Sequence, residues 1–145
     1  MKNPAVGYGM HLTLDGYDCH PEKLANLEVI YEFLDYCPEL IQMTKIMPPY
    51  VFKYQAQQPE DSGVSGFVLI AESHISIHTY PEKAYLSLDI FSCKDFDHHK
   101  AAAYATELFG IGRHEHHLLN RGVEFPREVK KVERLLRQER TRLRG

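Results

Sequence analysis

Residues 70–82, with the sequence IAESHISIHTYPE, gather side chains that can act as nucleophiles and bases. Ile75 and Ile77 alternate with polar residues, which is the period-two pattern of a β-strand with one apolar face. His74 and His78 would then share the other face, but four residues along a strand separate them by about 13 Å. One metal ion cannot bind both, so the two histidines must be interpreted separately.

Nucleophile chemistry is suggested by two further residues. Cys93 with His78 would make a thiol and its base, and Ser73 could supply a hydroxyl nucleophile. Residue type alone does not decide this, because a lone cysteine at a strand end is more often a small buried apolar residue.

A second histidine cluster comprises His114, His116 and His117. The first two would share a strand face about 7 Å apart. They lack an obvious carboxylate or thiol companion, so we interpret them as histidines of the surface or of an edge strand and expect no metal site.

Length and composition indicate one globular domain spanning residues 1–145, with 43% apolar and 26% charged residues. No apolar run approaches the roughly 20 residues of a membrane span, and the N-terminus lacks the apolar stretch of a secretory signal. We therefore expect a cytoplasmic protein with no membrane partner. Its three cysteines are odd in number and far apart, so reduced thiols are expected.

The net charge of −3 is unevenly distributed. Residues 127–145 carry eight Lys/Arg and three Asp/Glu, and their apolar residues recur at helical spacing. We expect a basic C-terminal helix whose charges form a solvated face, and no nucleic-acid partner.

Hydrophobic periodicity and turn signals predict the elements that must position these residues. A strand over 8–15 is followed by a helix over 21–37, which we expect Pro38 to end. A strand at 50–55 and a polar loop come next. Strand-like runs then cover 65–71, 73–80, 84–91 and 111–120, and a helix covers 97–109 with Gly110 as its C-terminal glycine.

Short turns between strands favour antiparallel pairing, and two long helices need a sheet face to cover. The expected fold is therefore α+β, a two-layer sandwich with helices on one face of a mostly antiparallel sheet. Leu86, Leu88 and Ile90 should face the helices. The opposite face should carry Tyr85, Ser87, Asp89, Phe91, Cys93, His74, Ser76, His78 and Tyr80. This mixed face is too apolar to be left to solvent, so we expect sheet faces paired across a homodimer that also frames a site.

Residues 63–93, GVSGFVLIAESHISIHTYPEKAYLSLDIFSC, closely resemble the signature of the prokaryotic S-adenosylmethionine decarboxylase proenzymes, whose pyruvoyl group is made from an internal serine. The matching features are the Gly-Val-Ser-Gly run, the Glu-Ser-His entrance, the Ile-His-Thr-aromatic-Pro-Glu continuation and the Asp-x-Phe-x-Cys end. Residues 7–24, GYGMHLTLDGYDCHPEKL, are also similar to the first strand and helix start of that family.

The resemblance implies roles for five residues. Ser73 would attack the carbonyl of Glu72, and β-elimination would then cut the chain into a β chain of residues 1–72 and an α chain of 73–145 capped by a pyruvoyl group. His78 would take the α-proton in the elimination, and Ser65 would help to hold the oxyester. Cys93 would protonate the substrate carbon after CO₂ leaves. His74 is expected only to share the face of His78.

The resemblance also implies that the self-generated pyruvoyl group is the only cofactor, forming a Schiff base with the substrate amine and accepting the electrons released with CO₂. Ser73 and His78 would fall on opposite faces of a straight strand, so we expect a kink at the Glu72–Ser73 junction.

S-adenosylmethionine is the expected substrate, and its decarboxylated product would be the aminopropyl donor for spermidine synthesis. Phe52 and Tyr54 are candidates for stacking on adenine, although the loop after them is longer than in the family. Tyr80, where relatives have tryptophan, can also stack, and Glu82 can accept hydrogen bonds from ribose hydroxyls.

Two alternatives remain open. A pyruvoyl-dependent decarboxylase of ornithine or arginine would need carboxylates for the distal cation, for which Asp15, Asp89 and Glu82 are candidates. The chain could also be an uncleaved, non-catalytic regulatory homologue. The intact serine, histidine and cysteine of the signature argue against that reading.

Overall fold

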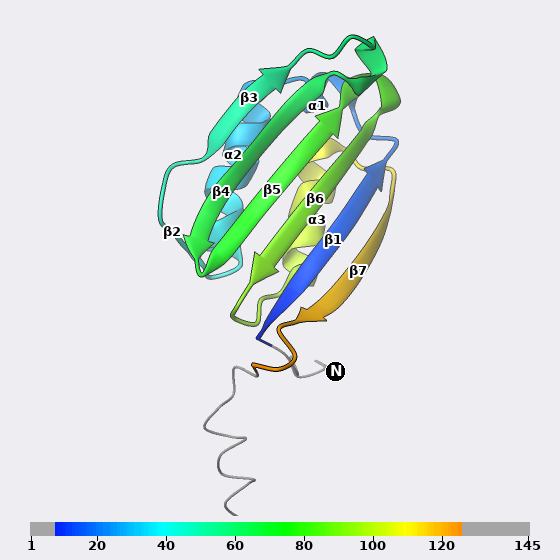
Figure 1. The fold of residues 1–145 in the computed structure, drawn as a ribbon. Coiled ribbons are helices and arrows are strands. Elements are labelled where there is room, and N and C mark those ends of the chain that lie inside the picture. Colours follow the sequence, from blue (N-terminus) through cyan, green and yellow to red (C-terminus); the bar gives the residue numbers. More distant parts are fainter. Residues whose placement is uncertain (1–7, 126–145) are drawn as a thin grey trace, which may run out of the picture.

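The computed structural model describes residues 8–125, which form one antiparallel sheet with helices against it (Figure 1). The strands are β1 (Gly9–Tyr17), β2 (Thr44–Lys45), β3 (Tyr50–Tyr54), β4 (Gly63–Ala71), β5 (Ser73–Tyr80), β6 (Tyr85–Ser92) and β7 (Arg113–Arg121). The helices are α1 (Pro21–Leu24), α2 (Leu27–Leu40) and α3 (His98–Phe109), with short 3₁₀ turns η1 (Pro59–Asp61) and η2 (Pro81–Lys83). The predicted helix over 127–145 lies outside the described residues.

The sheet has seven strands in the order β2-β4-β5-β6-β1-β7, with β3 also pairing with β4, and all pairs are antiparallel. The helices lie together behind the sheet in Figure 1, and within residues 8–125 no helix covers the other face. The predicted α+β class and the one-sided placement of the helices are therefore confirmed. We call the uncovered side the open face.

Strand alternation separates the core from the open face as the sequence predicted. Leu86, Leu88 and Ile90 are at most 1% exposed and belong to one core cluster with Ile75 and Ile77. Intervening residues of β5 and β6 are half-buried or exposed. The fixed register of the sheet therefore determines which polar side chains can meet on the open face.

The predicted helix over 21–37 is wrong in its bounds. The chain turns after Leu24, and a new helix begins where the Asn26 side chain accepts hydrogen bonds from the N–H groups of Glu28 and Val29. Pro38 does not end the helix, which continues to Leu40. Proline removes one backbone N–H donor from the last turn, yet the helix goes on for two more residues.

Thr79 fixes the far end of β5. Its side chain is 2% exposed; Oγ1 accepts the Val64 N–H at 3.0 Å and donates to the Leu24 carbonyl at 2.7 Å. Gly63 is required beside it, because an added Cβ would lie 1.7 Å from the Thr79 carbonyl oxygen. These contacts tie β4, β5 and the end of α1 together.

Helix α3 has the ends that the sequence predicted. The Asp97 carboxylate accepts hydrogen bonds from the N–H groups of His99 and Lys100, and Gly110 adopts a left-handed conformation with φ of 63°. No helix within residues 8–125 is long and apolar enough to cross a membrane.

Candidate active site

The Glu72–Ser73 junction is the turn between β4 and β5. Glu72 is exposed there, in a turn and not within a buried strand, and Ser73 begins β5 with φ of 133°. This value lies in the region that L-residues rarely adopt, and such backbone conformations cost about 1–3 kcal/mol. The expected kink therefore occurs at this bond.

Cys93 lies directly beside the same bond. Ser73 pairs with Ser92 across β5 and β6, and the Cys93 backbone N–H donates to the Glu72 carbonyl oxygen at 3.3 Å. That oxygen would carry negative charge if the carbonyl carbon were attacked, so the N–H is a donor of the kind that stabilises an oxyanion. The Cys93 side chain is 7% exposed and is more buried than the open-face alternation predicted.

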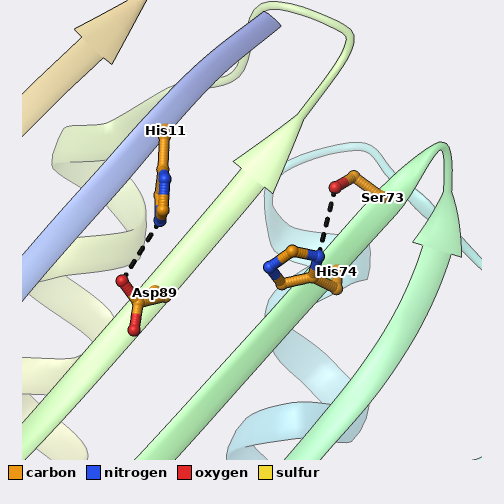
Figure 2. Close-up of polar contacts among 4 residues, drawn as sticks. All are labelled: His11, Ser73, His74 and Asp89. Atoms are coloured by element: carbon orange, nitrogen blue, oxygen red, sulfur yellow. Dashed lines mark hydrogen bonds and ion pairs between the residues drawn. The ribbon is translucent and has the colours of Figure 1, made fainter. Parts of the chain in front are cut away.

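His74 contacts the serine hydroxyl, which the sequence reasoning missed. Its Nδ1 lies 3.3 Å from Ser73 Oγ (Figure 2). Burial, and then the neighbouring His11, lower the pKa of His74, against the raising effect of Asp89. The only signal in the sequence was that Ser73 and His74 are adjacent. In a straight strand, however, two adjacent side chains point to opposite faces.

A second polar pair lies next to this junction on the open face. His11 Nε2 is 3.1 Å from a carboxylate oxygen of Asp89, as Figure 2 shows. The ring of Phe91 lies 5.8 Å from that of His11 and 6.1 Å from that of His74, and the guanidinium carbon of Arg121 is 4.4 Å from its centroid. The aromatic ring thus separates the two histidines and is itself covered by a cation.

His78 and Ser65 form a separate pair. Ser65 Oγ is 2.8 Å from His78 Nδ1, and the two residues are register partners on β4 and β5. His78 is five residues beyond Ser73 on the same strand, which corresponds to about 16 Å. The kink at the junction therefore does not bring this histidine to the serine within one chain.

The predicted adenosine-binding residues gather at the His78 end of the sheet. Phe52, the register partner of Ser65, is 41% exposed, and Tyr54 is 58% exposed. Tyr80 stacks on Tyr85 with ring centroids 5.5 Å apart. Glu82 and Tyr54 line a hollow of about 350 Å³ together with Ala25, Lys53, Gln55, Pro59, Ser62, Gly63, Val64 and Pro81.

Two of the three carboxylates considered for a basic amino-acid substrate already have partners. The Tyr85 hydroxyl donates to Asp15 at 2.6 Å, and Asp89 is paired with His11. Burial and this hydrogen bond raise the pKa of Tyr85, which therefore stays protonated as a donor. Only Glu82 among the three candidates lines the hollow.

Two histidines of β7, His114 and His116, lie on the helix side of the sheet, because their partners on β1 are Gly16 and the buried Leu14. His114 and His116 line a hollow beside α3, where the His116 ring is 6.0 Å from that of His98. Within residues 8–125, no group of three His, Cys, Asp or Glu side chains is arranged to hold a metal ion. His117, one residue further, pairs with Thr13 of β1.

Comparison with known proteins places the chain and its antiparallel sandwich in one family. The S-adenosylmethionine decarboxylase family profile matches residues 10–122. A Clostridium botulinum protein named S-adenosylmethionine decarboxylase proenzyme is 42% identical over 100 residues, covering 68% of this chain and 81% of its own. A Pyrococcus furiosus protein of the same name is 36% identical over 117 residues, covering 80% of each chain.

The crystal structure of the adenosylmethionine decarboxylase from Aquifex aeolicus superposes with a TM-score of 0.69 at 30% identity, over 80% of this chain and 92% of that one. The fold is thus that of a decarboxylase. The chain belongs to the S-adenosylmethionine decarboxylase family.

Proposed function

We propose that this chain is a self-processing decarboxylase that cuts itself between Glu72 and Ser73 and converts S-adenosylmethionine to its aminopropyl-donor product plus CO₂, for spermidine synthesis. The observation that carries the proposal is the junction itself. A serine in a strained conformation has a histidine at its hydroxyl, and the carbonyl preceding it accepts a hydrogen bond from the Cys93 N–H. A β-hairpin turn does not need these three features in order to form.

The residues around Ser73 fit a pyruvoyl group at the start of the α chain, 73–145. The serine is half-buried at a strand end, and the thiol of Cys93 follows its register partner Ser92. Such a group supplies an electron sink for the decarboxylation. Cys93 would then deliver a proton to the substrate carbon, since a positioned thiol can act as a general acid.

A homodimer completes the site in this proposal. Ser73, with Cys93 beside it, lies at one end of β5, and the Ser65–His78 pair lies toward the other end, about 16 Å away along the strand, with Glu82 beyond it in η2. A two-fold axis through the middle of the open face would set the first end of one chain against the second end of the other. His78 of the partner subunit would then reach Ser73.

The exposed apolar residues of the open face support the same interface. Tyr50, Phe52, Phe67 and Leu69 are between 36% and 57% exposed on β3 and β4. Large apolar side chains grouped in this way usually mark a protein contact. Pairing the open faces would bury them and exclude water from the site.

The substrate assignment rests on the aromatic and polar groups at the His78 end. Tyr54 and Glu82 can stack on a base and accept hydrogen bonds from ribose hydroxyls in the hollow between them. Ornithine or arginine remains the second candidate, and Glu82 would then hold the distal cation. The partners of Asp15 and Asp89 within the chain make those two carboxylates less available to a substrate.

Release of CO₂ from carboxyl-labelled S-adenosylmethionine, ornithine and arginine, measured side by side on the purified protein, tests the proposal. We expect release from S-adenosylmethionine, and none from any substrate with a Ser73→Ala variant. CO₂ release from ornithine or arginine but not from S-adenosylmethionine would reject S-adenosylmethionine as the substrate. CO₂ release by the Ser73→Ala variant would reject the pyruvoyl chemistry.

A further inference from the structure

We propose that His74, the residue directly after the cleavage site, is the base of the first processing step, the transfer of the Glu72 acyl group from the Ser73 nitrogen to its hydroxyl. The inference rests on the proposed self-processing and deepens it. His78 is then left with the later elimination, so two histidines act on one serine at different stages.

The contact that carries this inference is local. His74 Nδ1 lies 3.3 Å from Ser73 Oγ, at the outer limit of hydrogen-bond reach, as is common for catalytic pairs before the reaction. The His74 side chain is half-buried, and its ring lies between Leu69 of β4 and Phe91 of β6, its register partners on either side. Figure 2 shows the ring turned toward the serine at the start of β5. Neighbouring strands therefore hold the base close to the hydroxyl.

The surroundings of His74 favour the neutral imidazole that a base needs. The charged and titratable groups that act on it are His11 on β1, Asp89 on β6 and Arg121 on β7, and the β4 residue beside it, Leu69, is apolar. Burial, His11 and Arg121 lower the pKa of His74, and Asp89 opposes them. Asp89 is held 3.1 Å from His11, so its charge is shared with that neighbour.

The step balances without any external reactant. Ser73 Oγ bonds to the Glu72 carbonyl carbon while its proton passes to His74 Nδ1, and the carbonyl oxygen becomes an oxyanion beside the Cys93 N–H. His74 then returns the proton to the Ser73 nitrogen as the C–N bond breaks. The products are an ester and a free amine on the same residue. Relief of the strained Ser73 backbone, with φ of 133°, would favour this direction.

Trapping the ester separates the two histidines. Chains made by cell-free synthesis would be treated with hydroxylamine, which cuts esters and would release residues 1–72 as a hydroxamate. A His78→Gln chain should form the ester but not eliminate, so hydroxylamine should cut it. A His74→Gln chain should form the ester about 100-fold or more slowly, the usual contribution of a general base.

The pH dependence gives a readout that a structural role would not move. In the His78→Gln background, ester formation should slow as the pH falls below the lowered pKa of His74. A His74→Ala chain in the same background should lose this dependence and recover part of its rate with added imidazole. His116→Gln, on the other side of the sheet beside α3, is the matched control and should leave the rate unchanged.

The outcomes distinguish the inference from the function on which it rests. Ester formation by His74→Gln at the rate of the unsubstituted chain would overturn the role of His74 alone. A chain with native histidines that never becomes cut, with or without hydroxylamine, would overturn the proposed self-processing itself. If His74→Gln fails to fold, the imidazole response of His74→Ala and the pH profile of the His78→Gln chain still show whether His74 acts as the base.

Discussion

Two inactive chains should restore each other if the site is shared across a dimer. One chain carries Ser73→Ala and keeps His78; the other carries His78→Ala and keeps Ser73. Neither homodimer contains a site with both residues. A mixed dimer contains one complete site, made of Ser73 from one chain and His78 of the partner subunit.

The magnitude follows from the geometry of β5. Five residues of extended strand separate Ser73 from His78 by about 16 Å, whereas proton transfer needs contact at about 3 Å. The histidine therefore cannot serve the serine of its own chain. With random pairing at equal amounts, about half of the dimers are mixed, so about half of the Ser73-bearing chains should be cut at Glu72–Ser73.

The assay is intact-mass measurement of co-expressed chains that carry tags of different mass. Only the His78→Ala chain should yield fragments, and only when its partner is present. A control pair uses His114→Ala, whose side chain lines the hollow beside α3, in place of His78→Ala, and should give cutting without any partner. Complete cutting of the His78→Ala chain alone, or no cutting in the mixture, would refute the shared site.

Further predictions concern stability and turnover. Thr79→Val leaves the Val64 N–H and the Leu24 carbonyl without their buried partner, so the free energy of unfolding in urea should fall by about 2–4 kcal/mol, and less in Thr79→Ser, which keeps the hydroxyl. Equal loss in both variants would contradict this account. Cys93→Ala should cut itself, because the hydrogen bond that Cys93 gives to the junction comes from its backbone N–H, yet release CO₂ poorly; full activity would exclude the thiol as proton donor. The hydrogen bonds donated by the backbone N–H groups of Lys100 and His99 lower the pKa of Asp97 below that of an ordinary aspartate, so its stabilisation of α3 is complete above the ordinary value and should be lost as the pH falls through the lower folded value. Acid unfolding of Asp97→Asn should lack this contribution.

Much of the fold could be predicted because it depends on local pattern. The alternation of Leu86, Leu88 and Ile90 specifies which face of β6 is buried, and Asp97 and Gly110 mark the ends of α3. The bounds of α2 could not be predicted in the same way. A side-chain cap at Asn26 and a tolerated Pro38 each overrode the simpler helical pattern.

The sequence offered candidate members of the site but not their arrangement. Motif resemblance proposed Ser73, Ser65, His78 and Cys93, but strand spacing within one chain cannot show which of them meet. The hairpin places Ser73 at one end of β5 and the Ser65–His78 pair toward the other. His74 was overlooked because its contact depends on the positive φ at Ser73, which the sequence pattern does not encode.

The most direct test of self-processing is the intact mass of the purified, unsubstituted protein. The account predicts two fragments, 1–72 and 73–145, the second beginning with a blocked N-terminus that resists sequential degradation. A Ser73→Ala chain run beside it should stay whole. A chain with native Ser73 that remains at its full 145-residue mass after prolonged incubation would contradict the central claim.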